Sequence, residues 1–379
     1  MKKRPFVYLI PALIIALVSC NDHVFHIISV EPPITDPLIN GSPVNFVVFK
    51  NNVYAASGGS IYSYNGTNWN LIPSMPGGRI MQLAATDSYL YALCFQNSWE
   101  DSILKRSSSC ENWEDVKGVT DGYDRLQSVY AANDRVFIGA RAQGDSYVIL
   151  YIDEALNNDF KPLTPGGTTE TPESMLCGVA YDSDHAFYYL CTRGNTIFRM
   201  PAAGKPVKLI ADDTFTGIIN LGIKNIIVAI SRGGNLYNVN AGVNITVVSN
   251  ISLGSRPSTG ALAVWTDPAN TSNRLLLAGR QDRLDYAVDS GYTYGYMELE
   301  LDSGGIKNGK DFTVPGIGSP SSVDNYERYV STIGKFPINH IFQAPKNIDP
   351  DMTLFASTQK NGVWSYRERD GVPQWNAEE

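Results

Sequence analysis

Two short apolar strands joined by a polar turn recur along this chain, and this repeat constrains its fold more than any other feature. In the first copy, residues 46–49 (Phe-Val-Val-Phe) precede a turn at residues 50–52 (Lys-Asn-Asn), and residues 53–56 (Val-Tyr-Ala-Ala) follow it. Asn and Asp suit such turns because they tolerate left-handed backbone and hydrogen-bond their own main chain. Tyr54 of the first copy and Leu354 of the seventh are 300 residues apart, which gives a repeat of about 50 residues.

The other copies complete a count of seven units. Their second strands are predicted at residues 89–92, 135–138, 187–190, 226–229, 275–278 and 353–356. A third strand follows a Gly or Asn break, as at residues 60–64, and we expect a fourth at residues 208–210 and 245–248. Four-stranded units repeated radially form a β-propeller, so the sequence predicts an all-β fold of seven four-stranded blades. Residues 303–328, rich in Gly, Ser and Pro, are expected to form a loop or insertion between blades six and seven.

The composition agrees with this fold. The chain has 33 Gly, 21 Tyr and 14 Phe but only 18% charged residues, which is typical of many short strands and tight turns. Helical periodicity is hard to find after Cys20. A repeat architecture also removes the need for a second globular domain, because each repeat packs only on its neighbours.

The N-terminus has the three parts of a secretory signal peptide. A basic start at residues 2–4 precedes an apolar stretch at residues 5–18, and the small residue Ser19 stands immediately before Cys20. About 14 apolar residues are too few for a transmembrane helix, which needs roughly 20. We therefore expect three segments: a signal peptide over residues 1–19, a tether over residues 20–40 and the β-propeller domain over residues 41–379.

Residues 17–20 (Leu-Val-Ser-Cys) resemble the lipobox of bacterial lipoproteins. That resemblance implies that Cys20 carries the lipid, with acyl chains such as palmitate, and becomes the first residue of the mature protein. The expected location is the cell envelope, with a membrane anchor at Cys20 on the periplasmic or surface face. Secretion without a lipid is the alternative.

The charge of the chain limits its partners. Cleavage after Ser19 removes three basic residues and no acidic one, which changes the formal net charge from −8 to −11. An acidic chain does not favour nucleic acid as a partner, because binding to phosphates needs clustered Lys and Arg. It does not favour electrostatic membrane binding either, so the lipid has to provide the anchor.

Copies one, two and seven share a further motif near their outer strands. Ser63, Asn65, Gly66 and Trp69 have counterparts around Trp113 and Trp375; the matching stretches are residues 59–69, 104–113 and 361–375. These turns resemble the Asp-box of sialidase-type propellers, Ser-x-Asp-x-Gly-x-x-Trp, which is structural in that family. The resemblance implies a polar turn that closes on itself and a Trp that packs on the blade. Here Asn65 replaces the Asp in one copy and the Asp is missing in another, so the motif covers three blades at most.

Catalysis is not favoured by the sequence. Sialidase-type hydrolysis needs arginines, a Tyr/Glu nucleophile pair and an acidic residue, and the family's arginine motif is absent; the nearest string, residues 336–339, contains no Arg. We predict no catalytic residues and no cofactor. The four His residues have no zinc-site spacing, and turn chemistry accounts for the acidic pairs at residues 182–184 and 212–213, so we predict no metal.

Four cysteines remain after lipidation, and the cell envelope permits disulfides. Cys177 and Cys191 are symmetric about Asp184, at the centre of the fourth hairpin, so we predict that they face each other on adjacent strands. A turn shifted by one residue would place them on opposite faces. Cys94 and Cys110 bracket the second and third strands of blade two in a similar way. The alternative is that all four cysteines form no disulfide and pack as small, buried hydrophobic residues.

The C-terminal segment, residues 362–379, carries a second resemblance. It is similar to the tails of lipoproteins from treponeme spirochaetes, which implies an envelope-anchored propeller without an established activity. We expect this tail to form the outer strands of blade seven and residues 24–30 to pair near it. The predicted function is that of a non-enzymatic binding or scaffolding propeller with a protein or glycan partner, similar in architecture to propeller lipoproteins that assist outer-membrane protein assembly. A glycan-binding or sialidase-like glycan-active propeller is the alternative.

Overall fold

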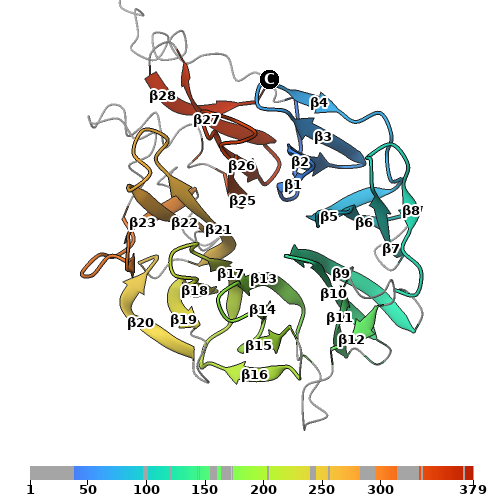
Figure 1. Cartoon of the computed structure of the whole chain (residues 1–379), viewed down its shortest axis with the longest axis horizontal. Helices are drawn as coiled ribbons and strands as arrows, with labels where there is room; N and C mark the ends of the chain where they lie inside the picture. The colour runs from blue at the N-terminus through green and yellow to red at the C-terminus, as the bar shows by residue number, and fades with distance from the viewer. Residues whose placement is uncertain are drawn as a thin grey trace, which may run out of the picture. The chain divides into compact units, whose positions relative to one another are not determined.

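The structure is a computed structural model. It describes residues 38–378 except for these positions: 97–100, 120–121, 143, 145, 154–159, 164–171, 173, 203–204, 240–244, 255–256, 282–294, 314–332, 334–335 and 370–371. The described chain forms seven four-stranded antiparallel sheets in a ring around a central axis (Figure 1). The predicted all-β fold, a seven-bladed β-propeller, is confirmed. Within these residues no helix is long and apolar enough to cross a membrane.

Each blade is a meander in which the strands follow chain order from the centre of the ring outwards. The innermost strands are β1 (Val47–Phe49), β5 (Arg79–Ala85), β9 (Tyr123–Ala132), β13 (Leu176–Asp182), β17 (Phe215–Asn220), β21 (Ser258–Thr266) and β25 (Ile338–Gln343). The second strands are β2 (Asn52–Ser57), β6 (Leu90–Phe95), β10 (Arg135–Ala142), β14 (Phe187–Thr192), β18 (Ile227–Ser231), β22 (Arg274–Arg280) and β26 (Leu354–Thr358).

The outer half of each blade contains two further strands. The third strands are β3 (Ser60–Tyr64), β7 (Ser102–Ser107), β11 (Tyr147–Asp153), β15 (Thr196–Pro201), β19 (Asn235–Val239), β23 (Tyr296–Asp302) and β27 (Val363–Arg369). The outermost strands are β4 (Trp69–Leu71), β8 (Glu114–Asp115), β12 (Lys161–Pro162), β16 (Val207–Ile210), β20 (Ile245–Ser252), β24 (Gly305–Ile306) and β28 (Val372–Ala377). The strand β24 lies in the segment that we expected to be a loop.

This topology gives the ring two different faces. Because the strands of a meander alternate in direction, every innermost strand begins on the face where the chain arrives from the preceding blade. We call this the crossover face, and the opposite one, which carries the turn between the first and second strands of each blade, the hairpin face. The hairpin turns use left-handed residues, as at Asn51, Asn133 and Asn225 (φ of 60°, 52° and 49°). Asn adopts this conformation more readily than most residues, as the sequence predicted.

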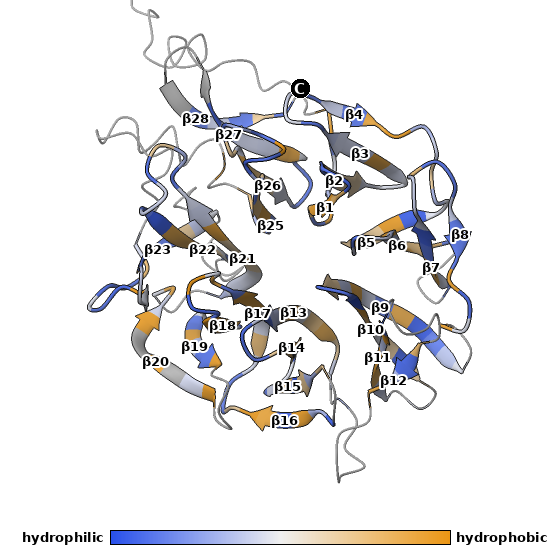
Figure 2. Ribbon diagram, viewed as in Figure 1, coloured by the Kyte–Doolittle hydropathy of each residue, from blue (hydrophilic) through white to orange (hydrophobic). Residues whose placement is uncertain are grey.

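The hydrophobic core is divided among the blade interfaces. Seven clusters of buried apolar side chains are found, one between each pair of neighbouring blades. Figure 2 shows hydrophobic residues on strands of all seven blades. All residues of β6, β18 and β26 are buried, because these second strands have strands on both sides and blades against both faces. Their apolar runs are therefore nearly continuous.

The interface between blades 7 and 1, which we call the seam, joins the two ends of the propeller. Each blade is built from consecutive strands, so among the described residues no strand is exchanged across the seam. Instead, residues 38–46 run against blade 7. The N–H of Leu38 donates to the carbonyl of Glu378 (2.6 Å), and the N–H of Val363 donates to that of Ile39 (3.0 Å). The tail forms β27 and β28, the outer strands of blade 7; residues 24–30 lie outside the described residues.

Candidate functional site

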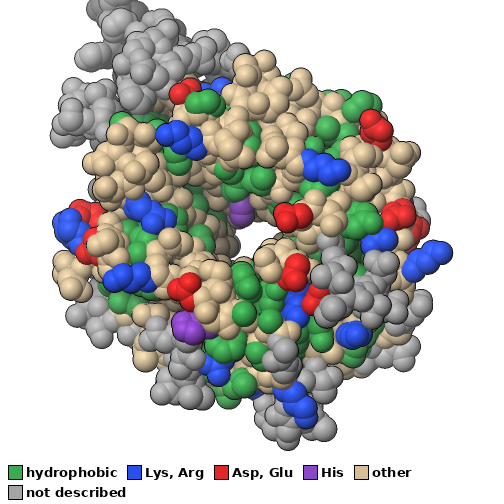
Figure 3. All heavy atoms as spheres, viewed as in Figure 1, with side chains coloured by type: hydrophobic (Ala, Val, Ile, Leu, Met, Phe, Trp, Pro, Cys, Tyr) green, Lys and Arg blue, Asp and Glu red, His purple; other side chains and the backbone are tan. Residues whose placement is uncertain are grey.

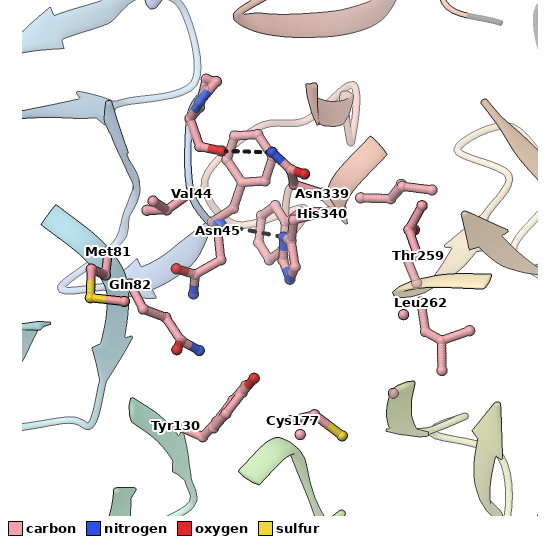
Figure 4. Close-up of a pocket in the computed structure, with 18 of the residues that line it drawn as sticks. Val44, Asn45, Met81, Gln82, Tyr130, Cys177, Thr259, Leu262, Asn339 and His340 are labelled. Atoms are coloured by element: carbon pink, nitrogen blue, oxygen red, sulfur yellow. Dashed lines mark hydrogen bonds between the residues drawn. The ribbon is translucent and has the colours of Figure 1, made fainter. Parts of the chain in front are cut away.

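A cavity of about 830 Å³ occupies the centre of the ring. Figure 3 shows the molecule hollowed at this point. The innermost strands of six blades, together with residues 42–46 before β1, provide the lining. Asn45, Gln82, Tyr130, Leu262 and His340 come from different blades and approach the cavity from different sides (Figure 4). The cavity is therefore a property of the closed ring and of no single blade.

The cavity differs in charge from the rest of the chain. The chain has 38 acidic and 30 basic residues, yet among the described residues that line the cavity none is Asp or Glu. Arg79 and Arg193 are among them. Both side chains are exposed, and within the described part of the chain neither has an ion pair or side-chain hydrogen bond. Two unpaired guanidinium groups in a lining that has no described Asp or Glu favour an anionic ligand.

Both arginines lie at the crossover face. Arg79 is the first residue of β5, and Arg193 directly follows the last residue of β14. Arg232 holds the equivalent position after β18: the N–H of Arg193 donates to Met175 (2.8 Å), and that of Arg232 donates to Thr214 (2.6 Å). Innermost strands begin and second strands end at this face, so the positive charge gathers at one mouth of the cavity.

Amide side chains near the cavity connect neighbouring innermost strands. Asn45 donates to the carbonyl of Leu83 (2.7 Å) and accepts from its N–H (2.9 Å). Gln343 bonds both backbone groups of Thr266 in the same way, at 2.8 Å each. These pairs replace backbone hydrogen bonds that strands of different blades do not form, and they keep buried polar groups satisfied. These amide groups are thus occupied by the ring itself.

His340 connects blade 7 to the segment before β1. Its Nδ1 accepts a hydrogen bond from the N–H of Phe46 (3.3 Å), drawn as a dashed line in Figure 4. Burial lowers the pKa of His340 from 6.5 to about 4, because the imidazolium would lose its hydration. A neutral ring that accepts at Nδ1 carries its proton on Nε2.

Tyr130 belongs to a group of polar side chains on the wall formed by blades 2 to 4. Burial raises the pKa of its phenol, the neighbouring Cys177 raises it further, and a hydrogen bond with Gln82 and the charge of Arg193 act in the opposite direction. The phenol therefore remains protonated and can donate a hydrogen bond. Figure 4 shows Tyr130, Gln82 and Cys177 on the same side of the cavity.

The structure brings Cys177 and Cys191 together, by a route that the sequence did not predict. Asp182 pairs with Phe187 and Gly178 pairs with Cys191, so the hairpin is shifted by one residue from the predicted symmetry about Asp184. A β-bulge lies at Cys177, between Leu176 and Gly178. The extra residue in a bulge compensates for the shift, and the two Sγ atoms are 3.6 Å apart. Both thiols are free.

Cys94 and Cys110 are not brought together. Cys94 pairs with Ile103 near the end of β6, whereas Leu90, at its start, pairs with Ser107. The N–H of Cys110 donates to Oγ of Ser107 (2.9 Å), which places Cys110 at that other end. Four residues of extended strand span about 13 Å. Both cysteines are buried in the cluster between blades 1 and 2, in keeping with the packing alternative.

The Asp-box-like turn of blade 1 lies on the outer strands. Asn65 Oδ1 accepts from the N–H groups of Thr67 and Asn68, at 3.2 Å each, and Trp69 is buried against Tyr64 with ring centroids 5.3 Å apart. A Cβ at Gly66 would lie 2.2 Å from the carbonyl oxygen of Ile348, so only glycine fits. None of these residues lines the cavity.

The remaining residues of the motif are also structural in position. Ser63 pairs with Asn70 between β3 and β4, and Trp113 Nε1 donates to the carbonyl of Ser74 (3.2 Å). Trp375 is buried and pairs with Tyr366 across β27 and β28, as Trp69 pairs with Tyr64. Cys20 and the predicted signal peptide lie outside the described residues. In the part of the chain that is described, no group of three or more His, Cys, Asp or Glu residues could hold a metal ion.

Sequence reasoning missed the cavity residues Arg79, Arg193, Gln82 and His340. One signal was present: a hydroxyl residue followed by Arg ends the second strand of blades 4 and 5, at residues 192–193 and 231–232. Aligning the repeats at this point would have placed Arg193 and Arg232 on one face of the ring.

No protein-family model matches the chain, and no curated protein matches it. Among solved structures, the chain is similar to the WD40 β-propeller domain of Doa1, with a TM-score of 0.54 and 10% identity over 89% of this chain and 95% of that chain. It is also similar to a chain in the crystal structure of the mitotic checkpoint complex, with a TM-score of 0.55 and 12% identity over 86% of this chain and 90% of that chain. At these identities the similarity concerns the fold alone.

Proposed function

We propose that this protein is a non-enzymatic binding or scaffolding propeller of the cell envelope, which receives an anionic group of a partner protein at the crossover mouth of its cavity. One observation carries the proposal: Arg79 and Arg193 are exposed and unpaired within the described chain, at a cavity whose described lining has no carboxylate. In an acidic chain, such a site is the one best suited to an anionic side chain or a C-terminal carboxylate.

Binding is favoured over catalysis because several of the uncharged polar side chains that line the cavity already have partners within the ring. Asn45, Gln343 and His340 form hydrogen bonds between blades. Most glycoside hydrolases use two carboxyl groups on either side of the scissile bond, and sialidase-type hydrolysis also needs acidic residues; the described lining contains no Asp or Glu. The propeller in the mitotic checkpoint complex belongs to a protein assembly, which gives the fold a precedent for protein partners.

The anchor is a separate part of the proposal. Cys20 would carry the lipid, and residues 20–40 would connect the membrane to the ring. Replacement of Cys20 by Ser should leave the protein unprocessed or released into the aqueous phase on detergent partitioning, because a net acidic chain has little affinity for an anionic membrane surface. A Cys20→Ser protein that is cleaved after Ser19 and still partitions with detergent would contradict the anchor.

Site-specific photo-crosslinking tests the binding site. A photoreactive amino acid at position 339, an exposed lining residue near the crossover-face end of β25, is compared with one at position 161, an exposed residue of β12 on the outermost strand of blade 3. We expect a discrete protein adduct from position 339 only, and its loss when Arg79→Glu is added. Equal adducts from both positions, or an adduct at 339 that persists with Arg79→Glu, would contradict a charge-dependent site at the mouth of the cavity.

A glycan-binding propeller is the second candidate. It is supported by Tyr130, an aromatic side chain of the lining that is only partly buried and senses the charge of Arg193, since sugars bind to aromatic faces and polar side chains. A glycan array with the full chain distinguishes the two candidates. Binding to carboxylate-bearing glycans that is lost in Arg79→Glu/Arg193→Glu would replace the protein partner by a glycan, and a blank array removes this candidate.

A further inference from the structure

The two thiols beside the cavity differ sharply in accessibility. Cys177 lines the cavity and is half-buried, whereas Cys191 is 0% exposed and lies among the apolar side chains between blades 4 and 5. Their Sγ atoms are 3.6 Å apart. A reagent that enters the cavity therefore meets Cys177 first, and Cys191 is reached only through it.

From this arrangement we infer that Cys177 and Cys191 form a thiol–disulfide exchange site, in which Cys177 reacts with low-molecular-weight disulfides in the cavity and Cys191 resolves the product. The inference is independent of the proposed partner, because it concerns the wall of the cavity and needs no ligand at its mouth.

The surroundings support this division of roles. Burial raises the pKa of the Cys191 thiol well above its ordinary value, as does the neighbouring Cys177, so Cys191 is a poor first nucleophile. Arg193 follows the strand that carries Cys191 and faces the same cavity as Cys177. Its positive charge attracts reagents with carboxylates, such as oxidised glutathione.

The hairpin already fixes the geometry that exchange requires. Five residue pairs, from Asp182–Phe187 to Gly178–Cys191, hold β13 against β14, and the bulge at Cys177 directs both thiols to one face. The two cysteines are only 14 residues apart. Because the strands hold the two thiols this close, the bridge can close and open while the hairpin stays paired. The pair is therefore suited to reversible chemistry in the folded protein.

The reaction has two steps. The Cys177 thiol loses its proton and attacks one sulfur of the disulfide RS–SR, which forms Cys177–S–S–R and releases one thiolate RS⁻. The Cys191 thiol then loses its proton and attacks Sγ of Cys177, which forms the Cys177–Cys191 bond and releases the second RS⁻. The two released thiolates take up, through water, the two protons that the cysteines lost. The two cysteines are thus oxidised by two electrons, and the low-molecular-weight disulfide is reduced to two thiols.

Mass mapping of the purified full chain after treatment with oxidised glutathione tests the site. Wild type should yield a Cys177–Cys191 linked peptide without lasting glutathione on either residue. Cys191→Ser should accumulate a glutathione adduct at Cys177, and Cys177→Ser should leave Cys191 unmodified. Cys94 and Cys110 are internal controls, because both are buried and neither lines the cavity. They should react at least about tenfold more slowly than Cys177 while the protein is folded.

Three results would overturn the inference. The first is wild-type protein that forms no linked peptide under conditions in which Cys191→Ser takes up glutathione. The second is Cys191→Ser protein whose Cys177 reacts no faster than Cys94 or Cys110. The third is a Cys191 adduct in Cys177→Ser at the rate seen for Cys177. Circular dichroism of each variant, matched to wild type, ensures that the comparison is made on folded protein.

Discussion

The seam between blades 7 and 1 and the interface between blades 5 and 6 are packed by different side chains. At the seam, aromatic rings fill much of the space: the ring of Phe46 lies 5.9 Å from that of Phe355 and 6.2 Å from that of Trp69. Between blades 5 and 6 the buried cluster is mainly aliphatic, and the backbones of the two innermost strands also meet directly. A Cβ at Gly217 would lie 2.4 Å from the carbonyl oxygen of Gly260.

The difference follows from how the chain connects each pair. Five residues, 253–257, join β20 to β21 between blades 5 and 6, whereas about 300 residues separate the partners at the seam. A loop of about 300 residues is about six doublings longer than one of five residues, so the entropy of closing it costs about 3 to 4 kcal/mol more. Since no strand of the described chain crosses the seam, aromatic packing and hydrogen bonds from residues 38–46 must offset this cost. The seam is therefore the interface at which loss of contacts should affect the whole ring.

The largest effect is expected from shortening the tail. Removal of residues 372–379 deletes β28, the buried Trp375 and the carbonyl that accepts from Leu38. The truncation both exposes the edge of β27 and removes contacts of the seam. We therefore expect the free energy of unfolding to fall by about 5 kcal/mol or more, which is comparable to the whole stability of a domain. Thermal unfolding followed by circular dichroism measures it, with removal of Glu379 alone as the control. A truncated protein with the wild-type melting temperature would show that the seam is dispensable.

Replacement of Phe46 by Ala tests the aromatic packing of the seam. Phe46 is 3% exposed and contacts the rings of Trp69, Phe342 and Phe355, so the cavity left behind should destabilise the protein by about 3 to 5 kcal/mol. Val48→Ala is the matched control on the same blade, because Val48 is 38% exposed; its effect should stay within about 0.5 kcal/mol. Urea titration measures the free energy of unfolding of both variants. An equal loss in Phe46→Ala and Val48→Ala would contradict the role of Phe46 in packing the seam.

The glycine contact between blades 5 and 6 should be nearly as sensitive, for a different reason. Gly260 has φ +87°, and a Cβ there would lie 2.3 Å from the carbonyl oxygen of Thr216. Gly260→Ala should therefore cost about 3 kcal/mol from backbone strain and displacement of β17. Gly254→Ala is the control: its φ is +64° but no atom lies within 4 Å of the added Cβ, so about 1 kcal/mol is expected. If both variants lose the same stability by urea titration, conformational strain alone explains the glycine and the close backbone contact does not.

The sequence predicted what repeats seven times and missed what occurs once. The strand–turn–strand unit is read in every copy, and left-handed Asn51 and Asn133 occupy the turns for the reason expected. The strand β24, Gly305–Ile306, is two residues long in a Gly-rich stretch, so no apolar run identifies it. The sequence predicted that Cys177 and Cys191 face each other, but the shifted register and the bulge at Cys177 that bring their thiols together follow from no spacing rule.

The cavity could not be predicted because its residues are distant in the chain. Arg79 and Arg193 lie in blades 2 and 4, and their common exposure at one mouth follows only after the ring is closed. His340 was one of four scattered histidines, and its hydrogen bond to Phe46 spans 294 residues. Local sequence patterns do not show which residues meet across the ring. The charge of the cavity depends on all the residues that meet there.

His340 makes the seam sensitive to pH, and this is the smallest of the four expected effects. Burial lowers the pKa of His340 from 6.5 to about 4 in the folded protein, so between these values the unfolded chain binds a proton that the folded chain does not. The contribution of the neutral ring to the free energy of unfolding is fully present above about pH 6.5 and is lost as the pH falls towards 4. At pH 5 the loss is about 2 kcal/mol. His340→Asn retains an acceptor for the N–H of Phe46 but does not titrate in this range. Urea titrations at pH 7.5 and pH 5 should therefore show a smaller loss for His340→Asn than for wild type by about that amount, and equal losses would mean that the imidazole is protonated in the folded seam.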